Sequence, residues 1–107
     1  MTDRELLELA AKAAGIEIDS WLNDSPVVVE MFRGHLPNYE DWNPLTDDGD
    51  ALRLAVDLWI EVRVFNGKAH AGKQNKFWCT EAVGEDSHAA ARRAIVCAAA
   101  EIGRGTL

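Results

Sequence analysis

A change of hydrophobic period near the middle of the chain constrains the fold more than any other feature of the sequence. Residues 48–58 place apolar side chains at helical spacing, whereas residues 60–65 alternate strictly between apolar and polar side chains, as a strand does. Asn66-Gly67 follows at once and favours a two-residue hairpin turn, in which both central residues have positive φ. A helix is therefore expected to run directly into an antiparallel hairpin. The apolar positions of that helix are Ala51, Leu52, Ala55, Val56 and Trp59.

Two further helices are indicated by capping residues and apolar spacing, one at each end of the chain. Residues 3–14 lie between a T-x-x-E capping box and a glycine that can adopt the left-handed conformation at a helix end. The last helix begins near residue 87 and carries a face of alanine and isoleucine. The expected caps are Thr2 with Glu5 and Gly15 for the first helix, Thr46 or Asp47 for the middle helix (Asp48–Leu58), and Asp86 or Ser87 with Gly103 for the last.

The segments between these helices have the composition of short strands. Val27–Phe32 is almost continuously apolar, which predicts a strand covered on both faces. Other strands are expected to begin at Ile16–Ile18, to return from the hairpin over Lys68–Ala71 and to form over Asn75–Val83, with Gly72 as a bulge or second turn and Asn38–Asn43 as a loop. Because the elements do not alternate as βαβ units, the predicted fold is α+β, with three helices packed on a mainly antiparallel sheet of three to five strands.

Length and charge limit the class of protein. The 107 residues are enough for one domain, residues 1–107, and the formal net charge of −7 argues against direct binding to nucleic acid. No apolar run approaches the length of a bilayer span, and the acidic N-terminal helix does not resemble a signal peptide. The expected location is therefore the cytoplasm, with no membrane partner.

Few residues could carry chemistry. The two cysteines and three histidines include no C-x-x-C pair and no nearby histidine pair, so the spacing does not indicate a structural zinc site, and the cysteines are expected to be reduced thiols. Residues 67–74 nearly match a phosphate-binding loop, but Gln74 replaces the hydroxyl residue and a strand is expected next in place of a helix. Cys79 with His70 or His88 is the only nucleophile pairing that the sequence offers. The sequence thus predicts no catalytic residue, no metal site and no cofactor.

Aromatic and acidic side chains near turns are the candidates for partner contact. Trp59 and Trp78 lie in predicted elements and are expected in the core, whereas Trp21 and Trp42 lie beside turns, where either a core position or an exposed contact is possible. The acids at the start of the middle helix match the positive end of its dipole and could also face a partner. The candidate contact residues are Trp21, Trp42, Asp47, Asp48 and Asp50.

Three segments of the chain resemble a known family. They are Thr2–Gly15, the run W-N-P-L-T-D-D-G-D-A-L-R-L-A-V over residues 42–56, and residues 91–104. Together they are similar to small phage and prophage proteins of unknown function that have a phage ABA-sandwich domain. The resemblance implies helices on both faces of the sheet, an α/β/α sandwich, and a bacterial host cell. It implies no catalytic residue.

Three hypotheses for function follow. The first is a small phage-encoded accessory protein that binds another protein, of phage or host, without catalysis; a homodimer is also possible. The second is an acidic decoy that occupies a nucleic-acid-binding or defence protein of the host. It requires that the acids Asp19, Asp24, Glu40, Asp41, Asp47, Asp48 and Asp50 cluster on one face. The third is an enzyme that uses Cys79 with a histidine.

Overall fold

The computed structural model describes residues 1–30, 38–74 and 76–105. Three helices and six strands are formed by these residues. In chain order they are α1 (Asp3–Ala14), β1 (Ile18–Leu22), β2 (Ser25–Glu30), β3 (Asn38–Asp41), α2 (Asp48–Leu58), β4 (Glu61–Phe65), β5 (Lys68–Lys73), β6 (Phe77–Ala82) and α3 (Ser87–Gly103). None of the three helices, within the described ranges, combines the length and hydrophobicity that a bilayer span requires.

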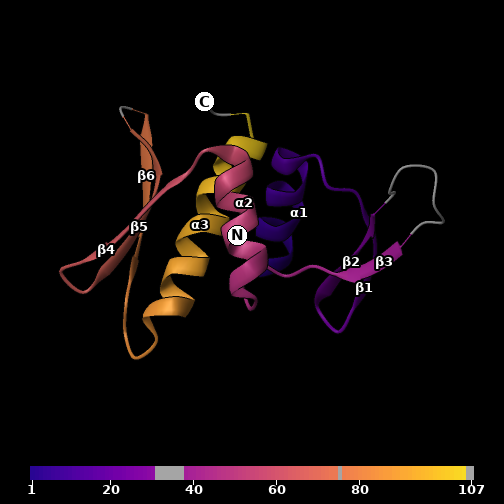
Figure 1. Cartoon of the computed structure of the whole chain (residues 1–107), viewed down its shortest axis with the longest axis horizontal. Helices are drawn as coiled ribbons and strands as arrows, with labels where there is room; N and C mark the ends of the chain where they lie inside the picture. The colour runs from indigo at the N-terminus through magenta and orange to yellow at the C-terminus, as the bar shows by residue number, and fades with distance from the viewer. Residues whose placement is uncertain (31–37, 75, 106–107) are drawn as a thin grey trace.

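The α+β class, the three helices and the antiparallel pairing are confirmed, but the strands form two sheets where one was expected. The first sheet has the order β1-β2-β3 and the second β4-β5-β6. Figure 1 shows the helices between the two sheets, with the second sheet against α3 and the first sheet at the opposite end of the molecule. Within the described residues the layers therefore run sheet, helices, sheet, and no sheet has helices on both faces as an α/β/α sandwich would.

The predicted capping residues determine where the helices begin and end. The Thr2 hydroxyl accepts a hydrogen bond from the Glu5 amide at 3.2 Å, and α1 ends at Gly15 with φ of 71°. Of the alternatives at the other two helices, the aspartates are the N-caps: Asp47 accepts from the amide of Asp50, and Asp86 accepts from the amide of Ala89. These local predictions are confirmed.

Small side chains allow α1 and α3 to approach closely. Ala10 and Ala11 of α1 and Ala94, Ala98 and Ala99 of α3 are all buried. Gly103 is the final residue of α3, as the sequence predicts, and a Cβ there would also collide with the carbonyl oxygen of Leu9. The glycine is therefore needed for the contact between the two helices.

The second sheet rests on α3 through one face only. Ala69 and Ala71 of β5 are fully buried under the helix, whereas Phe65 and Trp78 on the other face are 51% and 39% exposed. The prediction that Trp78 lies in the core is therefore wrong. The Asn66-Gly67 hairpin is confirmed, with φ of 53° and 70°.

Gly72 lies in a regular part of the second sheet, because β5 and β6 pair without a shift of register from Lys68 to Lys73. It is neither a bulge nor a turn, contrary to the prediction. A Cβ at this position would collide with the carbonyl oxygen of Phe77, so the close approach of the two strands requires glycine.

The first sheet corrects the prediction of a loop over Asn38–Asn43. Residues 38–41 form β3, which pairs with residues 27–30 of β2. Polar side chains hid this strand, because a strand at the edge of a small sheet needs few apolar residues. Val28 is buried and Val27 half-buried, while Met31 and Phe32 of the predicted run lie outside the described residues.

The contact between α1 and α3 gives a direct test of the fold. We expect Gly103→Ala to lower the free energy of unfolding by about 1–3 kcal/mol, because the backbone of α1 must move to admit the methyl group. Gly49→Ala in α2 is the matched control, since its Cβ would meet only the ends of the Asp47 and Arg53 side chains. Urea unfolding measures both. An unchanged midpoint for Gly103→Ala would show that the helices do not meet here.

Candidate functional site

Exposed apolar side chains gather where α2 meets the edge of the second sheet. We call Leu52, Val56, Trp59, Val62 and Val64 the α2–β4 patch. Leu52 and Val56 are each 64% exposed and Trp59 is 85% exposed. Between the helix and the strand lies an open, mostly apolar hollow of about 410 Å³, lined by residues that include Ala55 and Ile60. Such a patch is typical of a protein-binding surface.

The backbone at Trp59 explains its exposure. This residue caps α2 in the left-handed conformation, with φ of 58°, and its N–H is directed at the carbonyl oxygens of Ala55 and Val56. The conformation is unfavourable for a large side chain by about 1 kcal/mol. It also turns the indole away from the helix face that packs on the core. The prediction of a core position for Trp59 is therefore wrong.

The buried face of α2 also differs from the predicted stripe. Ala51, Leu54 and Ala55 are buried, whereas Leu52 and Val56 face outward. Most positions of this short helix are apolar, so more than one stripe fits the helical period. The sequence signal for an exposed apolar surface is that α2 has more apolar residues than one buried face can accommodate.

Strand β4 forms one edge of the second sheet and pairs only with β5 among the described residues. Phe65 and Lys68 flank the two-residue turn, so they form a hydrogen-bonded pair. The backbone groups of successive residues point in opposite directions, so Arg63 and Glu61 also bond to β5. Val62 and Val64 consequently present their N–H and C=O groups to the open edge. Such an edge can accept a further strand.

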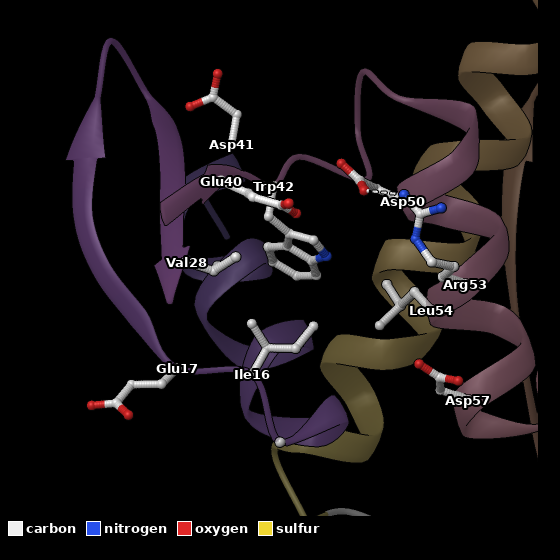
Figure 2. Close-up of a pocket in the computed structure, with 11 residues that line it drawn as sticks. Ile16, Glu17, Val28, Glu40, Asp41, Trp42, Asp50, Arg53, Leu54 and Asp57 are labelled. Atoms are coloured by element: carbon white, nitrogen blue, oxygen red, sulfur yellow. Dashed lines mark hydrogen bonds and ion pairs between the residues drawn. The ribbon is translucent and has the colours of Figure 1, made fainter. Parts of the chain in front are cut away.

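A larger hollow of about 690 Å³ lies between the first sheet, the end of α1 and α2. Figure 2 shows Trp42 at its centre, between Val28 and Leu54. We call this hollow the acidic groove because five carboxylates and one guanidinium line it. These charged residues are Glu17, Glu40, Asp41, Asp50, Asp57 and Arg53.

The carboxylates of the acidic groove do not converge on one point. Figure 2 shows the carboxylates of Glu17 and Asp41 directed away from the indole. Asp50 pairs with Arg53 at 2.8 Å, and this pairing raises the pKa of the guanidinium. Within the described ranges, no group of three or more acidic, histidine or cysteine side chains could hold a metal ion.

The aspartates predicted to face a partner fix the start of α2. Asp47 accepts a hydrogen bond from the Asp50 amide at 2.8 Å, and Asp50 accepts one from the Asn43 amide at 3.0 Å. Asp48 pairs with Arg92 of α3 at 2.6 Å. These contacts attach the start of α2 to the preceding segment and to α3.

The sequence allows either a core or an exposed position for Trp21 and Trp42, and the structure places one in the core and the other half-buried. Trp42 is only 7% exposed and packs in the core, while Trp21 is half-buried with the Arg4 guanidinium 4.4 Å from its ring centroid. Of the predicted contact residues, the structure brings Trp42 and Asp50 together at the acidic groove. It gives neither tryptophan the exposure of Trp59.

The geometry around the thiols does not favour a nucleophile. Cys79 pairs with Ala71 of β5 and faces α3. His70 precedes Ala71 in the strand, so its side chain points to the opposite side of the sheet, where it lies 3.0 Å from the Thr80 hydroxyl. Burial and nearby carboxylates raise the pKa of the Cys79 thiol. Burial, followed by the charge of Glu81, raises the pKa of Cys97 to about 11. Both thiols are therefore protonated near neutral pH, and a protonated thiol is a weak nucleophile.

The outer face of the second sheet carries a small cluster whose members contact one another. The Arg63 guanidinium lies 5.1 Å from the centroid of the Trp78 ring, and the rings of Phe65 and His70 are 4.9 Å apart. These side chains line a shallow hollow of about 200 Å³. Their mutual contacts account for their presence on this face.

A scan against protein-family models and searches of curated proteins and of solved structures found no match for this chain.

Proposed function

We propose that this protein is a small phage- or prophage-encoded accessory protein that acts by associating with a protein partner, without catalysis. The docking surface is the α2–β4 patch. The observation that carries this proposal is Trp59, a large aromatic residue that is 85% exposed in a left-handed backbone position. The phage origin rests on the resemblance of the three helical segments alone.

Trp59 combines two energetic costs, a left-handed backbone conformation and an indole that is 85% exposed to water. A glycine would satisfy the left-handed position without strain, and a polar side chain would be better solvated. Tryptophan is instead the residue type that contributes most to binding energy in protein interfaces when it becomes buried. Leu52 and Val56 extend the apolar surface along α2, so a partner would bury a continuous area.

The acidic decoy is the second candidate, favoured by the acidic groove. Glu40, Asp41 and Asp50 of the predicted acid cluster line this groove, together with Glu17 and Asp57. A basic partner would be attracted to them. Two features make this the weaker proposal: Asp50 is neutralised by Arg53, and Asp48 is engaged by Arg92.

The enzyme hypothesis has less support. Cys79 and His70 lie on opposite faces of one sheet, so His70 is not placed to act as a general base for the thiol. No hydrogen bond joins the side chains of Cys79 and His88 in the described part of the chain. Association without catalysis is therefore the proposal that the geometry favours.

Trp59→Gly separates stability from binding. We expect this substitution to raise the free energy of unfolding of the monomer by about 1 kcal/mol, because glycine adopts the left-handed conformation without strain. Urea unfolding at the lowest practical protein concentration measures the effect. Asn66→Gly is the matched control, since asparagine already tolerates positive φ and should gain less. A loss of stability in Trp59→Gly would mean that the indole supports the monomer fold.

Affinity capture tests the docking surface. A tagged chain is incubated with a host lysate that also contains the untagged chain, and retained proteins are identified by mass spectrometry. We expect one retained protein to be lost with Trp59→Gly and with Val56→Ser, because both remove apolar contact area from the patch.

Tyr39→Ala is the matched control for the capture, because Tyr39 is also an exposed aromatic, at 58%, on β3 at the far end of the molecule. It should retain the same protein as the unmodified chain. The proposal would be abandoned if the patch variants and the control retained identical proteins, or if nothing was retained by any of them.

A further inference from the structure

The open edge of β4 is complementary to itself in both charge and hydrophobicity. We infer that the protein that docks on the α2–β4 patch is a second copy of this chain, whose β4 pairs antiparallel with the first so that the second sheet continues across a two-fold axis. This inference rests on the proposed function and names the partner of the same surface.

The backbone limits which residues can meet across the axis. Val62 and Val64 present both N–H and C=O groups to the open edge. Ile60 can offer only its carbonyl, because its N–H already donates to the carbonyl oxygen of Ala55 at 2.8 Å. The two-fold axis must therefore pass through Val62, Arg63 or Val64.

The charged side chains that would face each other differ among these three registers. An axis at Arg63 would place two guanidinium groups directly opposite each other, and an axis at Val64 would place Val62 opposite Asn66 of the turn. An axis at Val62 instead places Glu61 of each copy opposite Arg63 of the other. The strand thus meets its own copy with opposite charges in one register only.

The same register matches the apolar side chains. Val62 lies opposite Val62 of the second copy, and Ile60 lies opposite Val64. These residues share the sheet face that α2 borders, next to the hollow beside Leu52 and Val56. In an antiparallel pair, opposing side chains lie on the same face, so the valines of the second copy would extend this apolar surface.

Trp59 lies just before the start of β4, and its indole is 85% exposed in the monomer. Burial of an exposed tryptophan beside the paired strands would add to the binding energy. The association is isologous, because each copy contributes the same residues, and it closes as a dimer.

Charge reversal at two positions tests the register. The oligomeric state of the full chain is measured by sedimentation equilibrium over a range of concentrations. Arg63→Glu and Glu61→Arg each place like charges opposite each other twice per dimer, so we expect each to raise the dimer dissociation constant by about tenfold or more.

Exchanging the two charges should restore the dimer. The double variant Glu61→Arg with Arg63→Glu rebuilds both ion pairs across the axis, and it also keeps the pair that these residues form within one chain at 3.1 Å. We expect its dissociation constant to return to within about twofold of the unmodified chain. Lys68→Glu, which places a charge change on neighbouring β5 away from the open edge, should leave dimerisation unchanged.

The outcomes distinguish this inference from the proposed function. A monomer at all concentrations that still captures a different protein in a Trp59-dependent manner would overturn the inference and leave the proposed function standing. A monomer with no Trp59-dependent capture would overturn both. A dimer that is insensitive to the single charge variants would place the interface elsewhere and overturn the inference.

Discussion

The left-handed backbone at Trp59 is the constraint on which the second half of the structure depends. The carbonyl oxygen of Ala55 receives N–H groups from both Trp59 and Ile60, so α2 ends and β4 begins within two residues. The strand therefore starts beside the helix that precedes it. This short connection leaves the outer residues of α2 next to the open edge of the sheet and leaves the indole of Trp59 exposed.

The helices form the centre of the molecule because their small side chains allow close packing. Gly103 lets α3 approach the backbone of α1, and Ala69 and Ala71 let the second sheet lie close to α3. One face of that sheet is covered in this way, while β4 remains an edge. The core and the α2–β4 patch thus arise from the same packing, which buries the inner residues of α2 and leaves its outer residues exposed.

Local features could be predicted from the sequence, while features set by distant residues could not. The caps at Thr2 and Gly15 and the Asn66-Gly67 turn depend on residues within one turn, so the sequence determines them directly. The division into two sheets depends on which strands meet after folding. The sequence of β3 is too polar to be predicted as a strand. The sequence does not reveal the α2–β4 patch, because the apolar residues of α2 fit two stripes and the contacts with α3 and α1 select between them.

Amide hydrogen exchange at β4 tests the central claim most directly, since it reports on the backbone groups that a second strand would bond. In dilute protein, the amides of Val62 and Val64 should exchange as freely as those of an open edge. In concentrated protein, both should become protected, while Arg63, which already bonds to β5, should change little. Equal exchange of Val62 and Val64 at every concentration would contradict pairing of β4 with a second copy.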